Sequence, residues 1–314
     1  MKVFYTLTMI LLVGLLITSS YLLWQNYNEF GGIPFLTNGN PNYGAFSANL
    51  SFAEGNNSQF YPNMRYKNKV IGYWIEPDCE AEKVQEMRSA MIILSEKTIL
   101  KFESKDKNQA EISILCSEIA PEPEEEGHFV AGEGGPSRII NTSTYSVILT
   151  GRIALYRNDK CDKPQIALHE LLHALGFDHK RDENSIMYPV TSCSQTLDES
   201  IVEEINQIYS IPSEPDLLIE RIGANLTGRY LNFEISVVNY GLNDMNGVKL
   251  RVLAAGEEVK VFDLGNLGVG VSKVLTVSNL KMPNDSDSIS FAVEGSSKEL
   301  SFLNNRVDLV LEER

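Results

Sequence analysis

Three of the four histidines in this chain of 314 residues fall within eleven positions. They are His169, His173 and His179, in the segment ALHELLHALGFDHKRDENSIMYP that runs from residue 167 to 189. Imidazole is a common metal ligand, so clustered histidines in a chain otherwise poor in them indicate a metal site. A surface helix that happens to carry histidines is the alternative interpretation.

The spacing of these residues predicts how they meet. His169 and His173 are four residues apart, so on a helix starting after Pro164 they project from one side and can chelate one ion. Gly176 predicts the end of this helix and a sharp turn that returns His179 towards the pair. Three neutral imidazoles and one water make a zinc site with an open position, and Glu170 is placed to reach that water without binding the metal.

With the methionine that follows, this segment resembles the metzincin metalloproteases, and within them the matrixin-like group. The residues that carry the resemblance are His169, Glu170, His173, Gly176, His179 and the turn SIMYP, from Ser185 to Pro189. The resemblance implies that Met187 forms an apolar floor under the metal and is not a ligand. It also implies a zinc-dependent endopeptidase in which Glu170 acts as general base on a zinc-activated water.

The sequence departs from the matrixin pattern at two positions. Lys180 stands after the third histidine, where matrixins commonly have serine, and Thr191 stands where their Pro-x-Tyr motif has tyrosine. Cleavage specificity therefore cannot be carried over from the family. No cysteine lies between residues 25 and 78, so the cysteine switch of many matrixins has no candidate here. No sequence feature supports a calcium requirement.

The elements that must position the site are predicted between residues 66 and 211. Apolar and β-branched runs indicate strands at 69–75, 99–103 and 110–116, and strand material around a turn at 144–157. Helical spacing of apolar residues predicts one helix after Cys79 and a closing helix that stops at Pro212. The glycines of 132–136 are expected to border the cleft.

The family resemblance places a substrate-binding edge strand shortly before the active-site helix. We assign this strand to Gly151, Arg152, Ile153, Ala154 and Leu155, where a peptide would add as an antiparallel strand. An ordinary sheet strand is the alternative. The expected fold is an α+β metzincin-type catalytic domain, a mixed sheet with an active-site helix, followed by an all-β immunoglobulin-like sandwich.

The N-terminus predicts export. Residues 1–24 contain one lysine and an apolar run long enough to cross a bilayer, so they form a membrane anchor or a cleaved signal peptide; the length of the run favours the anchor. Both interpretations place the remainder outside the cytoplasm. Residues 25–65, rich in Asn, Gly, Ser and Pro, are expected to form a flexible stalk.

The four cysteines are even in number, which in an exported chain indicates disulfides. Three pairings are open; we favour Cys79–Cys116 and Cys161–Cys193, because each lies within one half of the first domain. Metal binding by the cysteines is the weaker alternative, because no CxxC spacing occurs. The net charge of −15 argues against a nucleic-acid partner.

Residues 215–312 change character and predict a β-sandwich of short alternating strands. The pieces PDLLI, ISVVNYG, FDLGNLGVG and the pair Asn304–Asn305 resemble the CARDB group, an immunoglobulin-like domain of prokaryotic surface proteins. Such a domain could bind a surface partner. The expected function is therefore peptide-bond hydrolysis at the outer cell surface. The alternatives are an adhesion protein with a silent zinc domain and a zinc hydrolase of non-peptide substrates.

Overall fold

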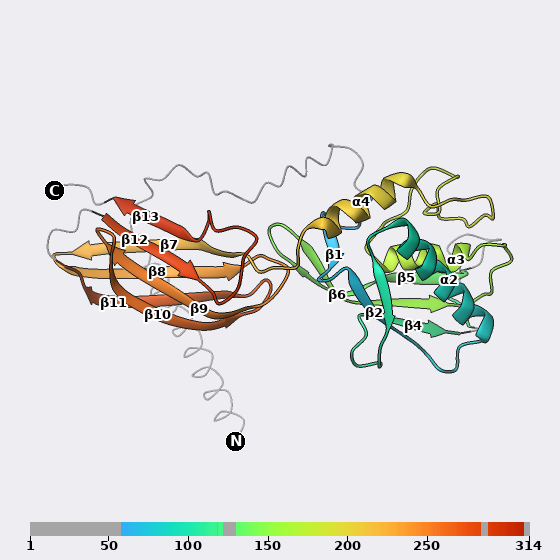
Figure 1. The fold of residues 1–314 in the computed structure, drawn as a ribbon, viewed down its shortest axis with the longest axis horizontal. Helices are drawn as coiled ribbons and strands as arrows, with labels where there is room; N and C mark the ends of the chain where they lie inside the picture. Colours follow the sequence, from blue (N-terminus) through green and yellow to red (C-terminus); the bar gives the residue numbers. More distant parts are fainter. Residues whose placement is uncertain (1–57, 118, 122–129, 284–287, 311–314) are drawn as a thin grey trace, which may run out of the picture.

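The structure, a computed structural model, describes residues 58–117, 119–121, 130–283 and 288–310 (Figure 1). The predicted anchor at 1–24, residues 25–57 of the predicted stalk, and residues 122–129, which include the fourth histidine, His128, lie outside these ranges. Within them, no helix has both the length and the apolar character needed to span a bilayer.

The first half of the described chain is built on one mixed sheet of six strands, in the order β1-β6-β4-β2-β3, with β5 paired to β6. The five strands in this order pair in parallel with their neighbours, and β5 is antiparallel to β6. The strands are β1 Met64–Tyr66, β2 Val70–Ile75, β3 Lys101–Ser104, β4 Ile112–Cys116, β5 Gly132–Asn141 and β6 Ser146–Leu155. This confirms the predicted mixed sheet.

Three helices accompany this sheet: α2 Ala81–Lys97, α3 Gln165–Ala174 and α4 Glu199–Ser210. In α2, Met87, Ala90, Met91 and Leu94 are buried at helical spacing and join the core. In α4, Ile201, Ile205 and Ile208 form the buried face that the sequence predicted. Helix α3 is buried along its whole length, because it packs against both α2 and the sheet.

The prediction that Gly151–Leu155 forms an edge strand is wrong. These residues lie inside β6 and have β4 on one side and β5 on the other. The expected turn within 144–157 is also absent, since residues 146–155 form one continuous strand. Among the described strands, β5 pairs only with β6. The free edge near the active-site helix therefore belongs to β5, which begins with the glycines of 132–136.

The folded region begins earlier than predicted. Residues 58–65, assigned to the stalk from composition, pack against the rest of the unit, and Met64 and Arg65 are each 1% exposed. The Arg65 guanidinium donates to the carbonyl oxygens of Ile208 (2.6 Å) and Ile211 (3.0 Å) and lies over the Tyr209 ring. Arg65 thus ties the start of the sheet to the end of α4.

Both predicted disulfides are present. Cys79–Cys116 joins the segment before α2 to the end of β4, and Cys161–Cys193 joins the segment before α3 to the loop after the SIMYP turn. The second bond therefore links both flanks of the histidine segment. The described residues contain no free cysteine.

The C-terminal part is a sandwich of two antiparallel sheets, β10-β9-β12-β13 and β11-β8-β7. Its strands are β7 Leu217–Thr227, β8 Tyr230–Asn239, β9 Met245–Ala254, β10 Glu257–Leu267, β11 Ser272–Lys281, β12 Ser288–Glu294 and β13 Arg306–Val310. Alternate residues of these strands, Phe233, Ile235, Leu250, Val252 and Phe291 among them, form its separate core. The predicted all-β sandwich is confirmed.

A small apolar cluster joins the two parts. Tyr145 and Val147, at the β5–β6 hairpin, pack with Leu242 and Val269 of the sandwich. All four side chains are buried. The turn of the β5–β6 hairpin is therefore held against the sandwich, and Figure 1 shows this turn pointing towards it.

Candidate metal centre

Helix α3 delivers two histidines and a glutamate from consecutive turns. It follows Pro164 and runs from Gln165 to Ala174. Gly176 then adopts a positive φ of 98°, which ends the helix and reverses the chain. A Cβ at this position would lie 2.6 Å from the Met64 side chain, so glycine is also required for packing.

The return segment that carries His179 is held by the N-terminal residues. The Phe60 N–H donates to the Gly176 carbonyl at 2.9 Å, and the Asp178 N–H donates to the Ser58 carbonyl at 2.8 Å. These bonds pair residues 58–60 with residues 176–178 as a short bridge. The segment that composition assigned to a stalk thus fixes the loop before the third histidine.

The three imidazoles converge through their Nε2 atoms. These atoms are 2.9 Å apart for His173 and His169, 3.1 Å for His173 and His179, and 3.3 Å for His179 and His169. Three nitrogens around one zinc at about 2.0–2.1 Å would be roughly 3.3 Å apart in a tetrahedral site. No other cluster of three or more His, Cys, Asp or Glu residues in the described ranges has metal-ligand spacing.

Hydrogen bonds at the Nδ1 atoms of His169 and His173 fix the tautomers that metal binding requires. His169 Nδ1 lies 2.6 Å from the Ile186 carbonyl oxygen, and His173 Nδ1 lies 2.8 Å from the Phe177 carbonyl oxygen. Since a carbonyl can only accept, each Nδ1 carries the proton and each Nε2 keeps its lone pair for a cation. The donor set therefore fits zinc.

The surroundings keep the imidazoles neutral. Burial lowers the pKa of His169 to about 3 and that of His173 to about 4, and neighbouring histidines contribute to both shifts. Burial also lowers the pKa of His179. At neutral pH all three are unprotonated, which is the form that binds a metal.

Glu170 lies in the same turn as His169 and is buried. Burial, with a smaller contribution from Glu133, raises the pKa of its carboxyl to about 8. A cation at the histidine cluster would lower this pKa again, because positive charge stabilises the carboxylate. The group is thus a carboxylate with a strong tendency to take up a proton.

The first glycines of β5 bring the edge strand against Glu170. A Cβ on Gly132 would lie 2.7 Å from Glu170 Cγ, and one on Gly134 would lie 2.2 Å from the Glu170 carbonyl oxygen. Between them, Glu133 accepts a hydrogen bond of 2.7 Å from the Tyr156 hydroxyl. Sequence reasoning found no role for Glu133. The alternate glycines were the signal for this close approach.

This close approach predicts the effect of an alanine scan along β5. Gly134→Ala is expected to destabilise the protein by about 1–3 kcal/mol, because the added methyl has no space beside α3. Gly135→Ala is the matched control, since its Cβ would meet nothing within 4 Å. Thermal unfolding measures both, with roughly 2–4 °C expected per kcal/mol. Equal midpoints for the two variants would refute the packing described.

The SIMYP turn links the first and third histidines. Ile186 supplies the carbonyl that contacts His169, and the next residue, Met187, accepts a 2.8 Å hydrogen bond from the Lys180 N–H. Met187 is fully buried in the core of the first unit. Its role as the floor of the metal site stays a prediction.

Lys180, the departure from the matrixin serine, has a structural role here. Its Nζ atom lies 3.2 Å from Asp198 Oδ1, and the other carboxylate oxygen of Asp198 accepts from the Ser185 hydroxyl at 2.6 Å. Asp198 immediately precedes α4. The loop after the third histidine is therefore tied to both the SIMYP turn and α4, an arrangement that sequence reasoning missed.

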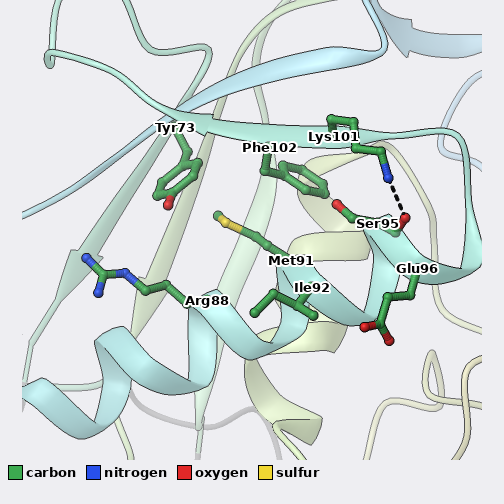
Figure 2. A pocket seen from close by; sticks show the side chains of 8 residues that line it. All are labelled: Tyr73, Arg88, Met91, Ile92, Ser95, Glu96, Lys101 and Phe102. Carbon is green, nitrogen blue, oxygen red and sulfur yellow. Dashed lines mark hydrogen bonds between the residues drawn. The ribbon is translucent and has the colours of Figure 1, made fainter.

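A pocket lies between α2 and the strands β2 and β3, and its lining contains none of the site residues described above (Figure 2). Its volume is about 340 Å³, and its lining includes Arg88 and Met91 of α2 and Tyr73 and Phe102 of the sheet. No residue of the histidine cluster lines it. We therefore do not include it in the candidate metal centre.

Comparison with known proteins agrees with this geometry. Residues 65–210 match the family model described as matrixin. No curated protein matches the chain. Among solved structures, the chain is similar to a CARDB domain of a Pyrococcus furiosus protein, determined in complex with di-metal ions. That match has 22% identity and a TM-score of 0.26, and it covers 31% of this chain and 85% of that chain. Residues 65–210 of this chain are therefore similar to the matrixins.

Proposed function

We propose that this protein is a zinc-dependent endopeptidase. The observation that carries the proposal is the convergence of three neutral imidazoles beside the buried carboxyl of Glu170. His169, His173 and His179 would hold the ion, which when bound activates water and polarises the scissile carbonyl. The match to the matrixin model over the same residues supports a peptide as the substrate.

Glu170 has the proton-transfer role in this proposal. Its carboxylate would accept a proton from the attacking water and pass it to the leaving amine. Burial supports this role, because a carboxyl held in an apolar setting takes up a proton readily. Tyr156 holds Glu133, the second carboxylate nearby, in a hydrogen bond.

The substrate would bind along β5. Since β6 occupies one side of this strand only, its other edge can accept a peptide through main-chain hydrogen bonds. Gly132 and Gly134 bring that strand within contact of Glu170, so a peptide paired there would pass the catalytic carboxyl. We therefore assign substrate binding to β5 and no longer to residues 151–155, which are internal to the sheet.

The proposed location is outside the cytoplasm. Two disulfides in the first unit support it, because such bonds persist in oxidising compartments. The apolar N-terminal sequence is consistent with export by either an anchor or a signal peptide.

Removal and return of zinc tests the proposed function. The full chain, incubated with unfolded casein, is expected to generate new internal termini that mass spectrometry detects. Chelation should abolish this cleavage because the three imidazoles then hold no ion, and added zinc should restore it. Cleavage that persists after verified removal of the metal would contradict the proposal.

A further inference from the structure

A second pocket, of about 590 Å³, opens beside the histidine cluster. Phe60, Tyr61 and Met64 line one part of it, Asp178 a second, and four residues of β5 a third: Gly135, Pro136, Ser137 and Ile139. The Phe60 ring is stacked on the His173 imidazole, with centroids 5.8 Å apart and an angle of 20° between the planes. The pocket thus shares a wall with the proposed catalytic centre.

The lining combines exposed aromatic surface with one negative charge. Phe60 is 38% exposed and Tyr61 is 48% exposed, although both are large and apolar in character. Asp178 is the single charged residue of the lining. Within the described part of the chain, no lysine or arginine forms an ion pair with it. This lining fits a side chain with a long apolar stem and a cationic end.

The position of the pocket along β5 tells which part of a substrate would reach it. Glu170 contacts Gly132 and Gly134, and the β5 residues that line the pocket, from Gly135 to Ser137 and then Ile139, follow on the same strand. A peptide antiparallel to β5, with its scissile bond near Glu170, would lay its amino-terminal side along 135–139. At about 3.3 Å per residue, the pocket faces the side chain two to four residues before the scissile bond.

We propose that this pocket selects arginine or lysine at that position of the substrate, with Asp178 as the specificity-determining residue. The proposal rests on the endopeptidase function proposed above. Phe60 and Tyr61 contact the methylene groups, and the Asp178 carboxylate pairs with the cation. Thr191 stands where the matrixin Pro-x-Tyr motif has tyrosine, so the cleavage specificity of that family cannot be assumed here. Another group must then contribute to specificity, and Asp178 is the one we assign.

Asp178→Asn tests the proposal with little change of structure. Asp178 Oδ1 accepts the His179 N–H at 2.7 Å, and an asparagine oxygen can accept the same bond. Asp162→Asn is the matched control, because Asp162 is exposed and does not line the pocket. Zinc content is measured for each protein, so that loss of metal is recognised.

The experiment compares kcat/KM for paired fluorogenic peptides, built on a site cut in unfolded casein. Members of each pair carry arginine or glutamine at one position two to four residues before the scissile bond. The wild type and Asp162→Asn are expected to prefer arginine about five- to tenfold at one of these positions. The preference should fall to about twofold or less in Asp178→Asn, and should weaken with salt in the wild type.

Three results would overturn the proposal, and they differ in what else they overturn. Equal rates for arginine and glutamine peptides in the wild type, or an arginine preference unchanged in Asp178→Asn, would remove the pocket assignment and leave the endopeptidase function standing. Failure of the zinc-loaded wild type to cut any peptide would remove both.

Discussion

Glu170→Gln is expected to lower kcat/KM for peptide cleavage by about 10²–10⁴-fold, the usual contribution of a general base. Glutamine keeps the size of the side chain and its place between α3 and β5, but it cannot take a proton from water. Because Glu170 is not one of the three converging ligands, the variant should bind zinc as the wild type does. Steady-state kinetics with a fluorogenic peptide, beside zinc analysis of the same samples, measures both quantities.

Glu133→Gln is the comparison that makes this result specific. Glu133 is the other carboxylate that influences the Glu170 pKa, and it bonds Tyr156. If Glu170 is the base, Glu133→Gln should lose no more than about tenfold in activity. This loss is much smaller than the one expected when the base is missing. A large loss of activity in Glu133→Gln, together with near-normal activity in Glu170→Gln, would show that Glu170 is not the base and that Glu133 transfers the proton.

His179→Ala is expected to weaken zinc binding by more than about 100-fold and to abolish cleavage at limiting zinc. Loss of a residue that only orients a ligand costs roughly 10–100-fold in metal affinity, and His179 is a ligand candidate itself. Competition with a chromogenic chelator measures the affinity. Among the three histidines, His179 is the exposed one, so its removal leaves no large cavity.

The metal-free proteins supply the control for this variant. Without zinc, His179→Ala and the wild type should unfold at similar temperatures, whereas with zinc only the wild type should gain stability. His128→Ala, a change at the fourth histidine of the chain, should leave zinc affinity unaltered. Wild-type zinc affinity in His179→Ala would exclude the three-histidine centre.

The metal centre could be predicted from sequence because its geometry is local. His169 and His173 meet through the repeat of one helix, and Gly176 reverses the chain three residues before His179. The same applies to the helices at 81–97 and 199–210, whose apolar residues recur at helical spacing. Each of these predictions depends on neighbours within a few residues.

The order of strands in the sheet could not be predicted in the same way. Residues 151–155 and 132–136 are both compatible with an edge position, and pairing between distant segments decides which one is internal. The glycines of β5 have weak strand propensity, yet they are needed because α3 packs directly on them. Tertiary contact therefore overrides local preference at the cleft.

Residues 58–65 illustrate the same limit. Their composition resembles a linker, but Gln59 forms two hydrogen bonds with the Met64 backbone, and Arg65 reaches carbonyls of residues 208 and 211. These partners are distant in sequence or depend on one turn conformation. Composition alone could not reveal that the segment supports the loop of His179 and one wall of the cleft.

Titration of zinc into the metal-free protein, with peptide cleavage as the readout, tests the central claim most directly. If His169, His173 and His179 together hold one catalytic ion, activity should rise in proportion to added zinc and reach its plateau at one equivalent per chain. A requirement for more than one equivalent, or zinc binding at one equivalent with no cleavage of any peptide, would contradict the account.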